Sequence, residues 1–221
     1  MSSIISCCEL CPGVNNCIPA EVPKCNHYTS GLTPLESTIV FVGEAPGKEE
    51  DKRKRVFVGK TGQELEQHYL PLAGLRRENV YITNAIKCLP VGHGGKLDLA
   101  RDKDLGLLAC CSSHSLYSEL EETKPRLIVP MGAFACYAID PDIQLDLQHG
   151  MPIETAWGTV FPMYHPAGGI HQPKHMIQIR TDFYRLGKYL KGKLRIPKDE
   201  FPHPKYNIII GDAAFDGKGP K

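Results

Sequence analysis

Short apolar runs alternate along the chain with stretches of helical periodicity. The apolar runs are rich in β-branched and aromatic residues, which is typical of buried strands. They cover residues 38–43, 80–83, 127–132 and 159–164. Apolar positions spaced three and four apart predict helices over residues 61–75, 102–122, 132–139 and 175–191. Because strands and helices alternate, we predict an α/β fold with a mostly parallel central sheet flanked by helices.

Polar segments follow directly after three of the predicted strands. They are Gly43–Gly47 (GEAPG), Asn84–Cys88 (NAIKC) and His165–Gly169 (HPAGG). Ligands of parallel α/β sheets bind beyond the carboxyl ends of the strands, so we expect these segments to converge. The charged run at residues 48–55 (KEEDKRKR) predicts a solvated loop, or a loop that orients water and contacts phosphate.

The composition is that of an ordinary globular protein. With 42% hydrophobic and 23% charged residues, the 221-residue chain is not of the disordered, collagen-like or coiled-coil class. No apolar run approaches the roughly 20 residues that cross a bilayer, and the N-terminus has no secretory pattern. We therefore expect an intracellular, cytoplasmic protein with one domain over residues 1–195, followed by a tail at 196–221.

The formal net charge of +1 hides a basic segment near the C-terminus. Residues 174–205 hold nine Lys and Arg against three Asp and Glu, and the preceding part of the chain is mildly acidic. Such an asymmetry indicates either a contact with nucleic acid or the solvated face of a charged helix.

Nine cysteines indicate a metal or redox site rather than a disulfide framework, because their number is odd and no export signal is present. Cys8 and Cys11 form a C-x-x-C pair, which can present two thiolates to one metal centre. The remaining ligands of such a site could come from distant positions, namely Cys88 with Cys110 or Cys111. They could instead come from nearby Cys17 and Cys25, which would form a local zinc knot. Cys136 lies among small apolar residues and is expected in the core.

Three side chains near the expected ligand edge each allow a structural and a functional interpretation. Phe57 is either a staple of its turn or a platform for a flat base, and base stacking is worth roughly 1–3 kcal/mol. Asn84 is either a turn residue or a reader of an amide-like edge through its donors and acceptor. His165 is either structural or a neutral donor to an oxygen that gains negative charge.

In their order along the chain, five motifs and the cysteines resemble the iron–sulfur uracil-DNA glycosylases (family 4). The motifs are GEAPG with Glu50-Asp51, Phe57–Gly62, Ile82–Cys88, Lys124–Gly132 and His165-Pro166. The resemblance implies a single domain with a central four-stranded parallel sheet flanked by helices. It also implies a [4Fe–4S] cluster, whose ligands are Cys8, Cys11, Cys88 and Cys111, with Cys110 as the alternative to Cys111.

The resemblance implies a DNA glycosylase that flips uracil, or a related modified pyrimidine, and hydrolyses its N-glycosidic bond in base excision repair. Glu44 and His165 are the implied catalytic residues, the first acting on water and the second donating to uracil O2. The implied binding residues contact the base or the DNA: Gly43, Ala45, Phe57 and Asn84 for the base, and Lys60, Ile170 and His171 for the DNA.

The chain departs from the family pattern after His165-Pro166. Ala167-Gly168-Gly169 stands where the family usually has a serine and a leucine-rich wedge, which predicts a flexible loop with Ile170 as its one apolar wedge. We therefore expect single-stranded or mismatched uracil-containing DNA as the partner, no membrane, and a monomer. Two alternatives remain open: a non-catalytic DNA-binding module of a larger replication or repair protein, and an enzyme that traps the sugar covalently through His93.

Overall fold

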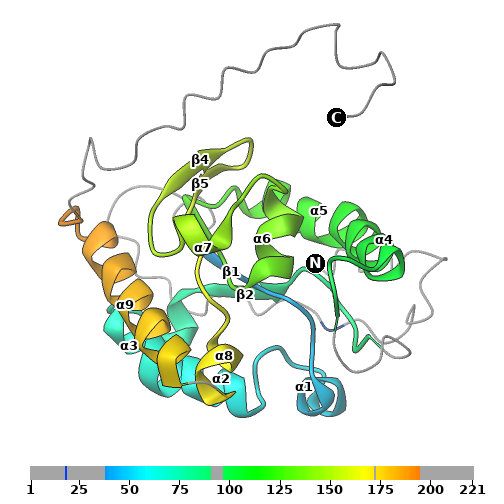
Figure 1. Cartoon of the computed structure of the whole chain (residues 1–221), viewed down its shortest axis with the longest axis horizontal. Coiled ribbons are helices and arrows are strands. Elements are labelled where there is room, and N and C mark those ends of the chain that lie inside the picture. Colours follow the sequence, from blue (N-terminus) through cyan, green and yellow to red (C-terminus); the bar gives the residue numbers. More distant parts are fainter. Residues whose placement is uncertain (1–17, 19–37, 91–96, 172, 195–221) are drawn as a thin grey trace, which may run out of the picture.

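A twisted sheet with helices on both faces forms the centre of the protein (Figure 1). The structure is a computed structural model and describes residues 18, 38–90, 97–171 and 173–194. The strands are β1 (Ile39–Gly43), β2 (Tyr81–Asn84), β3 (Leu127–Pro130), β4 (Ile153–Thr155) and β5 (Gly158–Val160), in the spatial order β2-β1-β3-β5-β4. Strands β2, β1, β3 and β5 are parallel, and β4 is antiparallel to β5. The predicted α/β fold and its four-stranded parallel sheet are confirmed, with an antiparallel edge strand that the sequence did not reveal.

Strand β1 separates two apolar layers. Ile39 and Phe41 pack into one layer, whereas Val40 and Val42 pack into the other, and all four are buried. A strand covered on both faces reads as a continuous apolar run, which is why IVFVG shows no polar alternation.

The first layer is built by the helical segment after β1 and by the last described helix. Its elements are α2 (Lys60–Glu64), the π-helical turn η1 (Leu65–Tyr69), α3 (Leu70–Leu72) and α9 (Pro173–Leu190). Phe183 of α9 stacks on Phe41 of β1 and on Tyr69, with ring centroids 6.2 Å and 5.4 Å apart. These aromatic contacts fix α9 against the sheet.

The second layer covers the opposite face of the sheet. Its elements are α4 (Asp102–Cys111), the π-helical turn η3 (Ser112–Leu116), α5 (Tyr117–Thr123) and α6 (Ala133–Ile139). Leu108, Leu116 and Leu120 of these helices pack with Val40 and Val42. Cys136 of α6 is buried, which raises the pKa of its thiol to about 12 and confirms its predicted place in the core.

The loop predicted at residues 48–55 is wrong, because Lys48–Arg53 form helix α1. The Glu50 side chain returns to the backbone N–H of Gly47 at 3.2 Å, and so closes the N-terminus of the helix. Acidic residues occupy the first turn and basic residues the last turn, an order that complements the helix dipole. Six of the eight charged residues therefore form a helix, which is favoured because acidic residues at 49–51 precede basic residues at 52 and 53.

The flexible loop predicted after His165 is also wrong, because Pro166–His171 form helix α8. Proline suits the first helical position, where no intrahelical N–H bond is lost. A Cβ at Gly169 would lie 2.9 Å from Tyr69 Oη and 3.3 Å from the Cα of Met176. The glycine therefore allows α8 to approach α9 closely, which explains its presence without requiring mobility.

The remaining elements are short, namely η2 (Arg77–Asn79) and α7 (Leu145–Gln148). Within the described ranges, no helix has both the length and the apolar composition that a membrane crossing requires. Several predictions fall outside these ranges: the tail at 196–221, the N-terminal cysteines at positions 8, 11, 17 and 25, and His93.

Candidate active site

The ends of β1 and β2 and the segment after β5 meet at one edge of the sheet. Gly43 and Asn84 are partners at the last position of the parallel β1–β2 ladder. Met163 forms a parallel bridge with Met131 beyond the end of β3, which carries His165 to the same edge. The topology therefore gathers the three segments that the sequence placed at the ligand edge.

A cavity of about 320 Å³ lies at this edge, within the size range of small-molecule sites. Its lining comes from four parts of the chain: Ala45, Gly47, Lys48, Glu49 and Glu50; Phe57, Gly59, Lys60 and Thr61; Asn84; and His165. Of the site residues predicted from the sequence, the structure thus brings Ala45, Phe57, Lys60, Asn84 and His165 around one cavity.

Gly43 lies next to two of the lining residues, Asn84 and Phe57. A Cβ at Gly43 would overlap Asn84 Oδ1 and would stand 2.5 Å from Cζ of Phe57. The missing side chain is therefore what lets the amide of Asn84 and the ring of Phe57 approach each other beside the end of β1. Both side chains are buried, with 3% and 7% of their surface exposed.

Phe57 is held in a left-handed backbone conformation, with φ of 49°. A non-glycine residue in this region costs of order 1–3 kcal/mol and needs support from its surroundings. Buried Arg77 supplies that support, because its guanidinium donates to the carbonyl oxygens of Val56 and Phe57, the latter at 2.8 Å. Gly62 is required as well, since a Cβ there would collide with the Phe57 carbonyl.

Glu50 ties together the two loops that flank the cavity. Its Oε1 accepts the backbone N–H groups of Val58 and Gly59 at 2.9 Å and 2.6 Å, while Oε2 accepts that of Gly47. Hydrogen bonds to a carboxylate are stronger than neutral ones. One side chain thus joins the loop after β1 to the turn that follows Phe57.

The His165 ring is neutral and has a defined tautomer. Burial lowers its pKa from the ordinary 6.5 to about 4, so the ring carries no charge near neutral pH. The backbone N–H of Ala167 donates to Nδ1 at 3.2 Å. Nδ1 therefore acts as an acceptor and the ring proton resides on Nε2. The ring centroid lies 6.0 Å from that of Phe57.

Among the predicted site residues whose side chains the structure describes, Gly43, Glu44 and Ile170 are not part of the cavity lining. Glu44 directly precedes the lining residue Ala45, is half-buried, and accepts the Ile86 N–H through its backbone carbonyl at 2.9 Å. Ile170 is partly buried in α8. His171 ends α8, and its side chain lies outside the described part of the structure.

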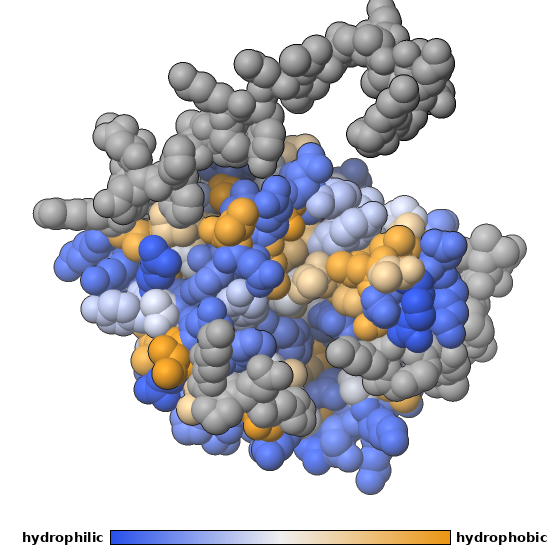
Figure 2. Space-filling view, in the orientation of Figure 1, coloured by the Kyte–Doolittle hydropathy of each residue, from blue (hydrophilic) through white to orange (hydrophobic). Residues whose placement is uncertain are grey.

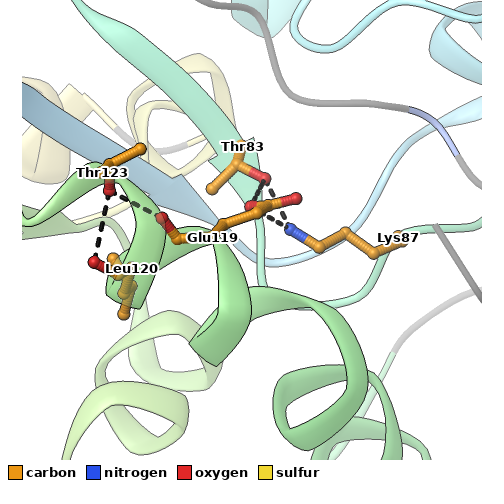
Figure 3. A network of polar contacts seen from close by, with 5 residues as sticks. All are labelled: Thr83, Lys87, Glu119, Leu120 and Thr123. Carbon is orange, nitrogen blue, oxygen red and sulfur yellow. Dashed lines mark hydrogen bonds and ion pairs between the residues drawn. The ribbon is translucent and has the colours of Figure 1, made fainter. Parts of the chain in front are cut away.

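A buried ion pair supports the strand end that carries Asn84 (Figure 3). Lys87 Nζ lies 2.6 Å from Thr83 Oγ1 and 2.7 Å from Glu119 Oε2, and Thr83 Oγ1 donates to the same carboxylate at 2.8 Å. Burial lowers the pKa of Lys87, and the Glu119 carboxylate opposes that shift. The network links the end of β2 to α5. Along the chain, Asn84 lies between Thr83 of β2 and Lys87 of the segment that follows.

Two of the predicted cluster ligands lie in one apolar layer. Cys88 follows β2 and Cys111 ends α4, and both are buried in the second layer, whereas Cys110 is partly exposed. The described residues contain no group of three or more His, Cys, Asp or Glu arranged for a metal ion, and Cys8 and Cys11 lie outside them. Thiols with low exposure are suitable ligands for an iron–sulfur cluster, and the described pair is compatible with one.

The structure also reveals supporting residues that the sequence did not indicate. Arg77 lies 20 residues from Phe57 in the chain, and an isolated arginine gives no sign that it is buried against a backbone turn. The role of Gly62 depends on the same turn. Glu50 belongs to a motif, but only the structure shows which N–H groups its carboxylate accepts.

The fold and the site together define an α/β protein with a cavity at the carboxyl edge of a parallel sheet, lined by an aromatic ring, an amide and a neutral imidazole. The chain belongs to the uracil DNA glycosylase superfamily, whose family model matches residues 30–185.

Curated relatives agree with this membership. The chain is 35% identical over 176 residues to the type-4 uracil-DNA glycosylase of Archaeoglobus fulgidus, and the aligned segment covers 76% of this chain and 83% of the relative. It is 38% identical over 136 residues to that of Thermotoga maritima, covering 60% of this chain and 66% of the relative. For the type-4 uracil-DNA glycosylase of Sulfurisphaera tokodaii, identity is 30% over 195 residues, covering 83% and 80% of the two chains.

Proposed function

We propose that this protein is a DNA repair glycosylase that hydrolyses the N-glycosidic bond of uracil in DNA. The observation that carries the proposal is the arrangement of Phe57, Asn84 and His165, from three separate segments, around one cavity of about 320 Å³. Membership of the superfamily and the names of the type-4 relatives support it. The target base has to leave the DNA stack to reach such a cavity, at a cost of a few kcal/mol.

Phe57 and Asn84 recognise the base. The Phe57 ring stacks on the flat face of uracil, while the Asn84 amide can donate to a carbonyl oxygen and accept from the N3–H group. The support that Arg77 and Gly62 give to the Phe57 backbone keeps the ring in place before the base arrives. Pre-organisation of this kind lowers the entropic cost of binding.

His165 stabilises the leaving base. When the C1′–N1 bond breaks, its electron pair goes to uracil and the sugar becomes an oxocarbenium-like cation. The proton on Nε2 of the neutral His165 ring is donated in a hydrogen bond to O2 as that oxygen gains charge, a contribution of roughly 3–4 kcal/mol for one donor. Glu44 orients the water whose oxygen bonds to C1′, and takes up the proton that this water loses.

A [4Fe–4S] cluster completes the proposal, with Cys8, Cys11, Cys88 and Cys111 as ligands. When bound, the cluster would supply a cross-link between the N-terminal segment, the end of β2 and α4, with no redox step. The burial of Cys111 in the same layer as Cys88 favours it over Cys110. Iron and sulfide contents and the visible absorption of the purified protein test this: Cys111→Ser should lose them, and Cys110→Ser should retain them.

Single-stranded or mismatched DNA is the proposed preferred substrate. Ile170, the one apolar wedge indicated by the sequence, is partly buried in α8 and is therefore poorly placed to insert between paired bases. Extrusion costs least where the base is unpaired. Base release from a uracil opposite guanine or in a single strand should be faster than from a uracil paired with adenine.

Base release from uracil-containing oligonucleotides, detected by cleavage of the abasic site in hot alkali, tests the activity. His165→Ala and Asn84→Ala should each lower the single-turnover rate by at least about a hundredfold, since each removes a contact made to the reacting base. Gly106→Ala is the matched control, because a methyl group there meets no atom within 4 Å. Absence of release from every uracil substrate by the cluster-containing protein would contradict the proposal and leave the non-catalytic alternative.

A further inference from the structure

Helix α9 presents a long face that no described element covers. Ile179, Phe183 and Leu186 point into the first apolar layer and are fully buried. On the opposite side, Ile177 and Tyr184 keep 68% and 53% of their surface exposed. Figure 2 shows mainly hydrophilic surface in this view, interrupted by apolar patches, one of them on the left flank where Figure 1 places α9.

The charge on this face has one sign. Arg180 and Lys188 of α9, and Lys191 just after it, are exposed, and none of the three forms an ion pair with another described residue. The single acidic residue of α9, Asp182, is fully buried and accepts a hydrogen bond from His149 at 2.9 Å. The helix therefore offers cations to solvent while its only carboxylate is turned inward.

An aromatic ring lies among these cations. Lys188 Nζ lies 4.8 Å from the centre of the Tyr184 ring, on the exposed side of the helix. Proteins that bind single strands combine aromatic rings, on which bases stack, with basic side chains that follow the phosphate backbone, and Tyr184 and Lys188 offer both.

Helix α8 connects the candidate active site to α9. His165 lines the cavity and leads directly into α8, which packs against both α2 and the start of α9. Figure 1 shows α8 beside α2, with α9 running from them along the side of the sheet. An 18-residue helix is about 27 Å long, the length of about eight nucleotides of one DNA strand.

We propose that the exposed face of α9 binds the phosphodiester backbone of the DNA that flanks the target nucleotide. This inference rests on the proposed function and extends it to a second contact outside the cavity. Arg180, Lys188 and Lys191 contact phosphates, and Tyr184 packs on the strand between them. An anionic partner matches a helix whose exposed charges are positive, and the start of this helix packs against α8, which directly follows the cavity residue His165.

The salt dependence of DNA binding tests the proposal. Arg180→Gln with Lys188→Gln removes two cations from the face. Each lost phosphate contact lowers the slope of log Kd against log salt by about 0.9 for duplex and about 0.7 for single strands, so the double variant should lose about 1.8 and about 1.4. The probe is a uracil-containing oligonucleotide of about 30 nucleotides, long enough to cover both the cavity and α9.

The matched control removes two cations from the other side of the sheet. Lys103→Gln with Lys124→Asn changes α4 and the left-handed residue that ends α5, where asparagine tolerates the φ of 42°. These helices pack in the second apolar layer, opposite α9. The control should leave the salt slope within about 0.3 of that of the unchanged protein, so a general loss of positive charge is separated from a local one.

Substrate length separates this proposal from the proposed function. The ratio of kcat/KM for the 30-nucleotide substrate to that for one of about five nucleotides should fall in the α9 variant, because the short strand cannot reach the helix. An unchanged salt slope and an unchanged ratio would overturn the proposal, even with uracil release intact. Loss of binding to anionic vesicles or to an acidic peptide, with DNA binding unaffected, would also overturn it and assign the face to that partner.

Discussion

Gly43→Ala perturbs the site through one methyl group placed behind the two base-binding side chains. The new Cβ would stand 2.5 Å from Cζ of Phe57 and closer still to Oδ1 of Asn84. Real carbon contacts are about 3.5 Å or more, so both side chains have to move. Because both are buried, neither can move without leaving its packed position.

The expected loss follows from the two contacts that the movement disturbs. Stacking of a base on an aromatic ring is worth roughly 1–3 kcal/mol, and a hydrogen bond to a neutral amide about 0.5–1.5 kcal/mol. A combined loss of about 2–4 kcal/mol corresponds to a decrease in kcat/KM of about 30- to 1,000-fold. Overpacking should also lower the free energy of unfolding by about 1–3 kcal/mol.

Single-turnover base release from a uracil-containing single strand measures the first effect, and urea unfolding followed by circular dichroism measures the second. Gly106→Ala is the control, since it adds the same methyl group to the interior of α4 with no neighbour within 4 Å. It should retain full activity and gain about 0.5–1 kcal/mol of stability. A folded Gly43→Ala protein with activity within threefold of the unchanged protein would show that the close approach of Asn84 and Phe57 is not needed for catalysis.

Three further changes act on the support of the site. His165 has a folded pKa of about 4 against 6.5 in the unfolded chain, so its contribution to stability is complete above pH 6.5 and is lost as pH falls to about 4. In urea unfolding between these pH values, the free energy of unfolding of His165→Gln should fall less with decreasing pH than that of the unchanged protein, by up to about 3 kcal/mol. Arg77→Met leaves two buried carbonyl groups without their donor, and should lower the free energy of unfolding by about 2–4 kcal/mol and slow base release as Phe57 loses its fixed conformation; normal activity would refute that role. Lys87→Met should cost about 3–5 kcal/mol in urea unfolding by leaving the Glu119 carboxylate unpaired, and adding Glu119→Leu should recover most of it; no recovery would contradict the ion-pair account.

Some strand and helix boundaries could be predicted from the sequence, and others could not. The buried strand IVFVG and the helix at 173–190 were predicted almost to their ends, because burial on both faces and a single apolar stripe are visible in the local pattern. The run KEEDKRKR was predicted as a loop, because apolar periodicity is absent from it. What makes it helical is the order of its charges and the return of the Glu50 carboxylate to the loops around the cavity.

The site residues divide in the same way. Phe57, Asn84 and His165 could be placed at one edge of the sheet from the sequence, because each follows a predicted strand or belongs to an ordered motif, and parallel strands end at the same edge. The shape of the cavity between them could not be predicted. It depends on Gly43, whose missing Cβ matters only because two side chains from other segments occupy the adjacent space.

Local patterning in the chain was thus sufficient to predict the α/β class, the positions of the parallel strands and the chemistry offered at their ends, whereas the order of the strands came only from the structure. Tertiary structure decided which backbone conformations are held there. Arg77 supports Phe57 across 20 residues, and the burial of His165 makes its ring neutral. Both effects arise from groups that are distant in the chain and adjacent in space, and a linear pattern contains no record of distances or of the exclusion of water.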